Sequence, residues 1–528
     1  MPQRVELYDV TLRDGAQGPG VKFSAEDQIR VVKELDAFGV SYIEGGQPGS
    51  NPKAAELFAR ARDLDLKRAK MAAFGSTRHA RSAVEDDANI KALLAAQTPV
   101  VTIFAKSSPT QVREVLRVKL DDNLKIIEES VAYLREQGRR VFLDAEHFFD
   151  GYKEDPTYAV ASMEAGFRAG AEVLVLCDTN GGSMPWEVAH ITAALRESLP
   201  ESQIGIHAHN DAGCGVANTL AGVQAGAMHV QATVNGYGER TGNANLITVV
   251  ANLQLKMGIE AVSPEQLKQL TSLSHVVAEL ANLTPCDSDP YVGRNAFTHK
   301  GGMHADAVRK MKTSYEHVQP ELVGNRTHIS VSEMSGRSSL LQKAQELGIT
   351  IDRDAPETKA ALARIKELEN EGYEFEAADA SLELLVRRAR GDQQRFFTLR
   401  DYRVIVEERA ASCPLCEATV KVDLPDGTQA HTVAEGHGPV DALSQALRKA
   451  LSFYEELNDM ELVDYKVRIL DSHAHTAAKT RVLIKSCDST GTTWDTVGVS
   501  DNIITASYLA LVDSIEYKLR LARNNKQT

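Results

Sequence analysis

The chain has only six cysteines among its 528 residues. That is too few for a disulfide framework of the kind that stabilises small secreted proteins. The first fifteen residues, MPQRVELYDVTLRDG, contain no apolar signal core. No stretch approaches the roughly 20 uninterrupted apolar residues that a membrane span requires. The sequence therefore predicts a cytoplasmic protein without a membrane partner.

An excess of positive charge is also absent, because the formal net charge is −14 at pH 7. Nucleic acids and anionic membranes favour basic surfaces, so we expect no nucleic-acid partner. A phosphate-bearing ligand is not excluded, since a local cluster of lysine and arginine or a helix N-terminus is enough to bind one.

The hydrophobic content of 43% and charged content of 25% are ordinary for a globular protein. A chain of this length exceeds the size of one hydrophobic core, which predicts two or three domains. The pattern of the chain changes near residue 275 and again near residue 396. We therefore expect a catalytic domain at 1–275, linker subdomains at 276–395 that contribute to the active site, and a C-terminal domain at 396–528.

Short apolar runs alternate with amphipathic helical stretches through the first region. One such stretch follows Ser24, a plausible N-cap, and stops at Gly39. Alternation repeated eight times predicts a (β/α)8 TIM barrel, with a doubly wound open sheet as the structural alternative. The eight predicted strands are 5–10, 41–46, 69–75, 100–106, 141–149, 173–179, 204–211 and 229–236.

The alternation fails after residue 275. Polar loops come first, and then helical stretches at 357–372 and 379–391 predict a mostly helical linker subdomain. The final region reads as a separate α+β domain, in which a duplication into two strand–helix halves is only weakly indicated. Its predicted strands are 396–408, 417–424, 465–471, 479–487 and 492–500, with helices within 437–454 and 502–519.

Polar residues gather where the predicted barrel strands end, and active sites of such barrels form at those ends. His207 and His209 point to the same face of a strand, so both imidazoles can reach one metal ion. Asp14, after the first strand, is the expected carboxylate ligand, and Asn243 is a fourth through its amide oxygen. Two imidazoles with oxygen donors suit Zn, Mn, Co or Mg, among which the sequence does not choose.

Three further positions have functional and structural interpretations. Arg13 can stabilise negative charge on a substrate oxygen or orient the Asp14 carboxylate. Asp144 and Glu146 share one strand face, and such paired acids are commonly catalytic or substrate-orienting. Glu44 can contact the ligands directly or through a neighbour.

Other histidines and cysteines carry weaker signals. His304 stands in the loop sequence KGGMHADAV, where a lone histidine is usually polar surface. Cys413 and Cys416 form a single C-x-x-C pair, and a structural zinc site needs a second pair of ligands. His473 and His475 repeat the H-x-H pattern outside the barrel without a carboxylate-rich context. Cys177 and Cys214 flank the predicted site, and we expect buried, inert thiols there.

Four ordered motifs now carry a family resemblance: VTLRDGAQ, IHAHNDAGCGVANTLAGVQAGA, NGYGERTGNANL and KGGMHADAV. They resemble the DRE-TIM metallolyase superfamily, and within it the isopropylmalate, homocitrate and citramalate synthases. The segments YIEGGQPGSNPK, AAFGSTRH, FLDAEHFFDGYK and LCDTNGGSMPWE look most like the citramalate synthase branch. The resemblance covers essentially the whole chain. Isopropylmalate synthases place serine where Asp144 stands, which leaves the role of Asp144 open.

The resemblance implies a role for each site residue. Asp14, His207 and His209 would bind the metal, with Asn243 as a closer or more distant ligand. Arg13 would contact the carbonyl of the oxo acid and Thr179 its carboxylate, with Glu44 and Asp144 also at the substrate. Glu146 and His304 would serve the acid–base chemistry, and Tyr315 matches a tyrosine that the family places near the active site.

The activity that the resemblance implies is the condensation of acetyl-CoA with pyruvate to give (R)-citramalate, in a route to isoleucine. Isopropylmalate or homocitrate synthesis from a larger 2-oxo acid is the alternative. A lyase of the same superfamily and an amino-acid-binding regulator without catalysis are further alternatives. The C-terminal domain would dimerise the chain and bind isoleucine as an effector, or serve only as a structural dimerisation module.

Overall fold

The computed structural model describes residues 4–50, 52–299, 304, 307–308, 310–329, 337–349, 351–352, 355–375, 378–391, 395–407, 415–470 and 478–527. Contacts divide the chain into two compact units. One unit consists of Met1–Phe297 with Glu316–Thr327, and the other of Thr298–Tyr315 with His328–Thr528.

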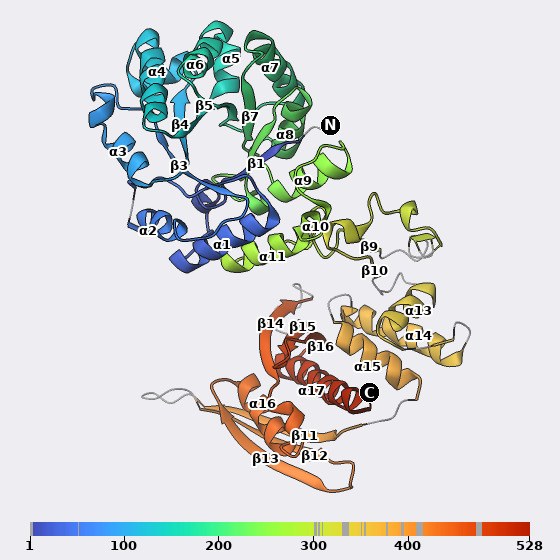
Figure 1. The fold of residues 1–528 in the computed structure, drawn as a ribbon. Helices are drawn as coiled ribbons and strands as arrows, with labels where there is room; N and C mark the ends of the chain where they lie inside the picture. The colour runs from blue at the N-terminus through green and yellow to red at the C-terminus, as the bar shows by residue number, and fades with distance from the viewer. Residues whose placement is uncertain are drawn as a thin grey trace. The chain divides into compact units, whose positions relative to one another are not determined.

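Eight parallel strands in the first unit close into a barrel, and their spatial order is their order in the chain (Figure 1). The barrel closes where β8 pairs with β1, in the register Glu6 to His229 and Asp9 to Ala232. The predicted (β/α)8 barrel is therefore confirmed, and the open sheet is wrong. The strands are β1 (Glu6–Asp9), β2 (Tyr42–Glu44), β3 (Lys70–Ser76), β4 (Val100–Lys106), β5 (Arg140–Glu146), β6 (Val173–Asp178), β7 (Gln203–Ala208) and β8 (His229–Ala232).

Helices surround the strands in this unit (Figure 1). The first helix begins after Ser24, whose side chain accepts from Asp27 N–H, and stops at Gly39 with φ 98°. A left-handed residue ends a helix at little cost when it is glycine. The helices are α1 (Ala25–Phe38), α2 (Pro52–Ala61), α3 (Ala88–Ala95), α4 (Leu120–Glu136), α5 (Phe148–Glu154), α6 (Pro156–Arg168), α7 (Pro185–Ser198), α8 (Gly215–Gln224), α9 (Leu246–Leu255), α10 (Pro264–Leu267) and α11 (Leu270–Leu280).

Short helical turns complete the connections of this unit. Their bounds are η1 (Gly15–Gln17), η2 (Val84–Asp86), η3 (Gln111–Leu116), η4 (Val234–Gly236) and η6 (Pro320–Val323). None of the helices in the described ranges is long and apolar enough to cross a membrane.

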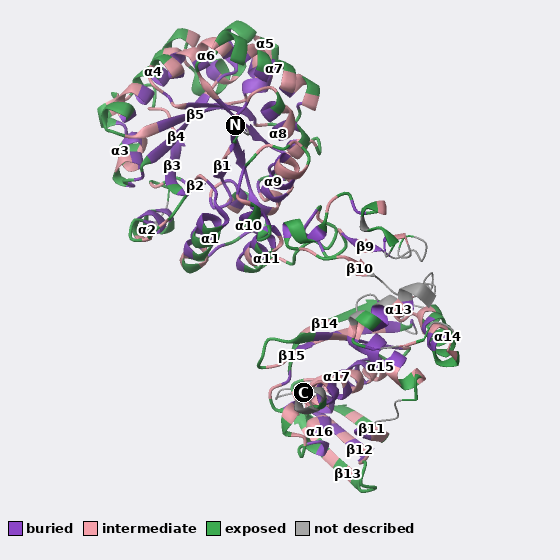
Figure 2. Cartoon of the chain, turned by 45° about the vertical axis from the view of Figure 1, so that its right-hand side comes forward, coloured by how far each residue is buried: buried purple, intermediate pink, exposed green. Residues whose placement is uncertain are grey.

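The barrel interior is divided between an apolar part and a polar part. Strand residues are buried almost throughout (Figure 2), and large side chains such as Tyr8, Tyr42 and Phe142 pack together inside. The rings of Tyr42 and Phe142 meet edge to face at 5.0 Å. Because alternate strand residues point inward, the inward positions nearer the carboxyl ends of β2, β5 and β7 hold Glu44, Asp144 and His207. The apolar packing leaves that end to the polar side chains.

The second unit begins with a short parallel pair, β9 (Thr298–His299) and β10 (His328–Ile329), and the turn η5 (Lys312–Ser314). Three helices follow: α13 (Arg337–Glu346), α14 (Pro356–Glu371) and α15 (Asp379–Ala389), of which the sequence predicts the last two. Their apolar side chains share one core with Val497 and Val499 of a later strand. These helices therefore depend for their packing on the last part of the chain.

The rest of this unit repeats one arrangement, three antiparallel strands followed by a helix. Thr432 Oγ1 donates to Ala446 O at 2.8 Å in the first half, and Thr496 Oγ1 donates to Ala510 O at 2.8 Å in the second. Gly427 and Gly491 turn the last hairpin of each half with φ 82° and 81°. The halves are β11 (Thr398–Glu407), β12 (Leu415–Asp423), β13 (Gln429–Gly436) and α16 (Pro439–Ala450), and, after η8 (Glu455–Leu457), β14 (Glu461–Ile469), β15 (Thr480–Cys487), β16 (Thr493–Ser500) and α17 (Ile503–Gln527).

Strand β13 was not predicted from the sequence. Its residues QAHTVAEG alternate, but the inward positions hold small or polar side chains, so the apolar signal of a strand is weak. The strand forms because β12 pairs with it along eight residues, from Cys416–Gly436 to Asp423–Gln429.

Candidate metal centre at the mouth of the barrel

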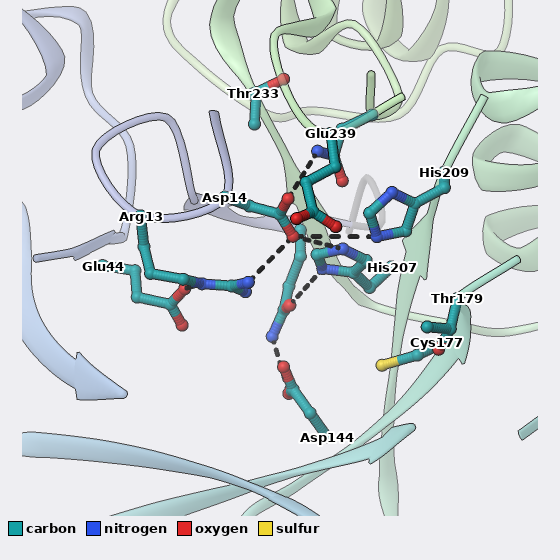
Figure 3. A network of polar contacts seen from close by, with 12 residues as sticks. Arg13, Asp14, Glu44, Asp144, Cys177, Thr179, His207, His209, Thr233 and Glu239 are labelled. Carbon is teal, nitrogen blue, oxygen red and sulfur yellow. Dashed lines mark hydrogen bonds and ion pairs between the residues drawn. The ribbon is translucent and has the colours of Figure 1, made fainter. Parts of the chain in front are cut away.

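Asp14, His207 and His209 lie together at the carboxyl end of the barrel (Figure 3). Asp14 follows β1, while His207 stands in β7 and His209 directly after it. All three side chains are buried, and one ligand atom from each lies within 4.8 Å of the others. Residues almost two hundred positions apart in the sequence therefore form a group that could hold one metal ion.

The distances within this group fit a shared cation. His207 Nε2 lies 3.3 Å and His209 Nε2 lies 3.8 Å from Asp14 Oδ2. Two ligands of one ion, with bonds of about 2.1 Å, lie about 3.0–3.4 Å apart in octahedral or tetrahedral geometry. The first separation matches, and the second requires a small movement of His209.

The charge states of His209 and Asp14 also suit a metal ion. Burial and the neighbouring His207 lower the pKa of His209 to about 4, so its ring is neutral at pH 7. Burial raises the pKa of Asp14, but Arg13 and the imidazoles outweigh burial and hold that pKa well below its usual range. For His207, burial lowers the pKa, and Asp14 outweighs that effect and raises it.

Asn243 also reaches this group. Its Nδ2 donates to Asp14 Oδ1 at 3.2 Å and to Tyr237 O at 3.1 Å. Its Oδ1 is buried and has no hydrogen-bond partner in the described part of the chain. Gly238 permits this approach, because it has φ 153° and any Cβ there would lie 2.2 Å from Asn243 Nδ2. An unpaired buried oxygen is costly unless something binds it, which agrees with the donor atom predicted from the sequence.

Arg13 is held from several sides. Its Nε donates to Glu44 Oε1 at 2.5 Å, and its Nη1 donates to Asp14 Oδ2 at 2.9 Å. The guanidinium carbon lies 3.9 Å from the centre of the Phe74 ring. Glu44 is completely buried and accepts a second bond from Tyr8 Oη at 2.6 Å. Arg13 therefore orients Asp14, as one sequence interpretation holds, while Nη2 makes no bond to a described residue.

Asp144 connects to His207 through Gln231, a residue that the sequence analysis did not single out. His207 Nδ1 lies 2.7 Å from Gln231 Oε1, and Gln231 Nε2 donates to Asp144 Oδ1 at 3.0 Å. Burial, together with the charge of Glu44, raises the pKa of Asp144 to about 7.

Glu146 and Thr179 lie at the ends of β5 and β6. Glu146 forms an ion pair with Lys106 Nζ at 2.5 Å, a lysine that was also not predicted. The Thr179 hydroxyl accepts from His147 N–H at 2.8 Å, which leaves its own proton free to donate. The side chain of Arg240 binds the Thr179 carbonyl at 2.8 Å and so ties the 234–242 loop to β6.

His304 and Tyr315 belong to the second unit. Their rings stack with centroids 4.1 Å apart, and both side chains are exposed. They are therefore neighbours of one another, and their contribution to the barrel site stays a prediction.

The remaining sequence signals have mixed outcomes. Cys177 is buried, and burial raises the pKa of its thiol, which is consistent with an inert cysteine. Cys416 is buried in the core of the first C-terminal half. Cys413, His473 and His475 lie outside the described residues.

Comparison with known families places this fold in a class. Residues 4–277 match the HMGL-like family, residues 291–373 the homocitrate synthase post-HMGL domain-like family, and residues 376–519 the LeuA allosteric (dimerisation) domain. The chain is therefore an HMGL-like barrel joined to a LeuA-type domain.

Full-length relatives narrow the class. The chain is 50% identical over 521 residues to an (R)-citramalate synthase of Aquifex aeolicus, covering 98% of both chains. It is 50% identical over 517 residues to that of Geobacter sulfurreducens, covering 98% of this chain and 97% of the relative. It is 44% identical over 518 residues to that of Sulfolobus acidocaldarius, with the same coverage. The chain belongs to the (R)-citramalate synthase family, which confirms the resemblance in the sequence.

Proposed function

We propose that this protein condenses acetyl-CoA with pyruvate and water to give (R)-citramalate and CoA. The observation that carries the proposal is the group of Asp14, His207 and His209 at the mouth of the barrel. It stands in a chain that matches (R)-citramalate synthases over almost its whole length. A 2-oxo acid that chelates a cation at this group would present its ketone carbon beside Arg13.

Asp14, His207 and His209, with Asn243 as a fourth donor, would hold a divalent cation such as Mn, Mg, Zn or Co. The cation would polarise the ketone of the oxo acid as a Lewis acid. Arg13 would donate a hydrogen bond from Nη2 to the ketone oxygen, where negative charge builds during the attack. Its other nitrogens are occupied by Glu44 and Asp14, so the guanidinium would not have to reorganise.

A base must remove a proton from the acetyl methyl group of acetyl-CoA, and we assign this role to His304 or Glu146, with Tyr315 nearby. The methyl carbon then bonds to the ketone carbon, and the alkoxide takes up a proton. Water cleaves the thioester, releasing CoA and leaving the new carboxylate. Thr179 would donate its hydroxyl proton to the carboxylate of the oxo acid.

Aromatic packing around Arg13 supports a small oxo acid. The rings of Phe74 and Phe104 stack at 5.5 Å beside the Arg13 guanidinium. These side chains would fill space that a longer substrate needs. One methylene changes the binding free energy in an apolar pocket by about 1–3 kcal/mol, so weaker activity with 2-oxobutyrate is part of this proposal.

The C-terminal domain would dimerise the chain. Hydrophobic side chains remain exposed on the edge strands β11 and β14, and a partner chain would cover them. The exposed residues are Ile405, Val406, Leu462, Val463, Val467 and Ile469.

Isoleucine would act as the effector of this domain. A hollow of about 780 Å³ beside β13 and α16 has both cationic and anionic side chains in its lining, including His437, Asp441 and Lys449. An amino acid carries both charges and matches such a lining. The N–H of His437 is bonded to Asp441 Oδ2 at 2.9 Å, so the effector carboxylate would pair with Lys449 rather than with the start of α16.

The proposal assigns one role to each region. Residues 1–275 would carry out catalysis, residues 276–395 would supply His304 and Tyr315 to the active site, and residues 396–528 would regulate the enzyme. It also includes a cytoplasmic location, which the five described cysteines support because all of them are free thiols.

A thiol-release assay tests the function. CoA should appear only when acetyl-CoA, a divalent cation and pyruvate are all present, and more slowly with 2-oxobutyrate. Preference for a larger oxo acid would assign the chain to isopropylmalate or homocitrate synthesis. Cleavage of citramalyl-CoA without net condensation would identify a lyase. No release with any oxo acid, from a protein that binds the cation, would refute a synthase.

A further inference from the structure

We propose that Gln231 is a positioning residue that holds His207 in the tautomer with the proton on Nδ1, and that Asp144 fixes Gln231 in turn. This inference rests on the proposed function, because it concerns how the barrel presents His207 to a cation. Two hydrogen bonds carry it: His207 Nδ1 to Gln231 Oε1 at 2.7 Å, and Gln231 Nε2 to Asp144 Oδ1 at 3.0 Å (Figure 3).

The orientation of the Gln231 amide sets the donor and acceptor roles of its two neighbours. The amide turns its NH2 group toward Asp144, whose Oδ1 accepts from Gln231 Nε2. The amide oxygen of Gln231 then faces His207, and an oxygen can only accept. The proton of the imidazole must therefore lie on Nδ1, which leaves the lone pair of Nε2 for a cation. A reversed amide would require the proton on Nε2 and would block that nitrogen.

The backbone holds this amide in place. Gln231 lies in β8 opposite Tyr8 of β1 and opposite His207 of β7. Its side chain is 1% exposed, so water does not compete for either end of the amide. Asp144 is 3% exposed and comes from β5, on the other side of the barrel interior. Three strands therefore meet in one buried chain of hydrogen bonds.

The two histidines of the group are unequal in this respect. His209 Nδ1 is buried and has no hydrogen-bond partner in the described part of the chain. Only His207 has the outer hydrogen bond that commonly orients a metal-binding imidazole, and loss of such a bond lowers metal affinity about 10–100-fold. Gln231 should therefore matter for the cation through His207 alone.

Cobalt binding tests the inference without reference to turnover. Gln231→Met keeps the side-chain length and removes both hydrogen bonds, and the Co²⁺ dissociation constant should rise about 10–100-fold. Gln231→Glu keeps an oxygen opposite His207 Nδ1, so its Co²⁺ affinity should lie closer to that of wild type than the affinity of Gln231→Met does. Gln203→Met is the matched control. Gln203 Nε2 also donates to a carboxylate, Glu6 Oε2, at a distance of 2.9 Å, but this pair lies apart from the metal-binding group. That variant should bind Co²⁺ like wild type.

Equal Co²⁺ affinity of Gln231→Met and wild type would overturn the inference, and so would an equal loss in Gln231→Met and Gln231→Glu. A His207→Ala variant separates this failure from that of the proposed function. If His207→Ala loses Co²⁺ binding while Gln231→Met keeps it, the metal centre is supported and the positioning role of Gln231 is wrong. If wild type itself fails to bind Co²⁺, the proposed function fails first, and this inference with it.

A measurement on the wild-type chain makes the test independent of how the variants fold. In the Co²⁺-loaded protein, a ligating imidazole gives a hyperfine-shifted proton resonance from its remaining N–H group. The resonance of His207 should exchange slowly with water, because Gln231 accepts that proton in a buried place. Assignment comes from its nuclear Overhauser contact with the side chain of Gln231 in the wild-type protein. Rapid exchange of this resonance in the wild-type protein would contradict the hydrogen bond and the inference.

Discussion

The barrel mouth and the C-terminal domain both gather charged side chains, but they bury them to different degrees. At the mouth, Glu44 and Asp144 are 0% and 3% exposed, and each is bonded to a polar neighbour. Beside α16, His437 and Lys449 line a hollow with exposed side chains. A buried charge needs a partner in the folded state, so the mouth is one connected network. An exposed charge can take up and release a ligand.

The two halves of the C-terminal domain differ as well. In the second half, Asp513 of α17 accepts from Ser381 and Arg388 of α15, at 2.7 and 2.9 Å. In the first half, the corresponding helix α16 borders the hollow instead. One half is thus attached to the linker helices, while the other offers a surface to a small molecule. We expect changes at the mouth to abolish activity and changes in this domain to alter its control.

The largest effect is expected from His207→Ala. It removes one of three predicted ligands, so metal content should fall from about one ion per chain toward zero, and kcat/KM should fall at least ~10³-fold. Elemental analysis and the thiol-release assay measure both. Isoleucine binding, followed by calorimetry, should persist if the two regions are independent.

His190→Ala is the control for this substitution, since His190 is an exposed histidine on α7. It should retain metal and activity. Normal activity of metal-loaded His207→Ala would remove the ligand assignment and, with it, the contrast between the two regions.

Arg13→Lys should have the second largest effect. Lysine keeps the charge but cannot bond Glu44, Asp14 and a substrate oxygen together, as the forked guanidinium does. We expect kcat to fall about 10²–10³-fold with a smaller change in KM for pyruvate. Steady-state kinetics of CoA release measure this.

The comparison variant is Arg140→Lys. In the wild-type protein, Arg140 Nε donates to Glu172 Oε2 at 2.6 Å, at the start of β5 and away from the barrel mouth. Its kcat should stay near wild type. An equal loss in both variants would mean that the effect of Arg13→Lys is general destabilisation of the barrel.

Lys449→Glu should have a moderate effect on regulation. It reverses a charge in the lining of the hollow, so the isoleucine concentration for half-inhibition should rise about tenfold, equivalent to about 1.4 kcal/mol. The measurement is the ratio of activities with and without isoleucine over a concentration series. Deleting residues 396–528 would be a weaker test of the isoleucine site, because α13–α15 share their core with Val497 and Val499 and would lose that packing.

Lys421→Glu is a suitable control, since Lys421 lies in β12 outside the lining and binds Asp401 at 3.3 Å. Unchanged inhibition in Lys449→Glu would place the effector elsewhere in the chain.

The smallest effect is expected from Asp488→Asn in the last hairpin. The Thr490 hydroxyl and Lys518 lower the pKa of Asp488 to about 2 against the effect of burial. A carboxyl whose pKa is lower in the folded state stabilises that state above its unfolded pKa of about 3.9, and this contribution is lost as the pH falls toward 2. The variant should melt about 1–2 °C below wild type at pH 6, with the difference shrinking below pH 4.

Asp426→Asn provides the comparison within the other half. Asp426 is exposed, its pKa is lowered by the Thr428 hydroxyl, and it has no lysine partner among the described residues. Thermal melting should show a smaller loss than for Asp488→Asn. A difference between Asp488→Asn and wild type that does not change with pH would exclude the ionisation of Asp488 as its origin.

Much of the fold could be predicted because periodic patterns are local. The eight apolar runs and the Ser24 and Gly39 signals specify barrel elements without knowledge of distant contacts. Strand β13 escaped because its inward residues are small, and pairing with β12 decides its conformation. The duplication of the C-terminal domain was barely visible in sequence, since few positions, such as Thr432 and Thr496, keep the same side chain in both halves.

The candidate site divides in the same way. His207 and His209 stand out because a two-residue spacing on a strand puts both on one face, and Asp14 follows from the closure of the barrel. Gln231 and Lys106 carry no such signal, since single polar residues on buried strands fit many environments. Pairing of neighbouring strands brings Gln231 beside His207 and Lys106 beside Glu146, and barrel closure brings Gln231 to Asp144.

The sequence by itself determined the alternation of strands and helices, the residue types able to bind a cation, and the family. The tertiary structure decided which polar atoms meet: the Arg13 contacts with Glu44 and Asp14, and the path from Asp144 to His207. The physical reason is range. Periodicity and capping act over a few residues, whereas the hydrogen bonds that close the barrel join residues more than two hundred positions apart.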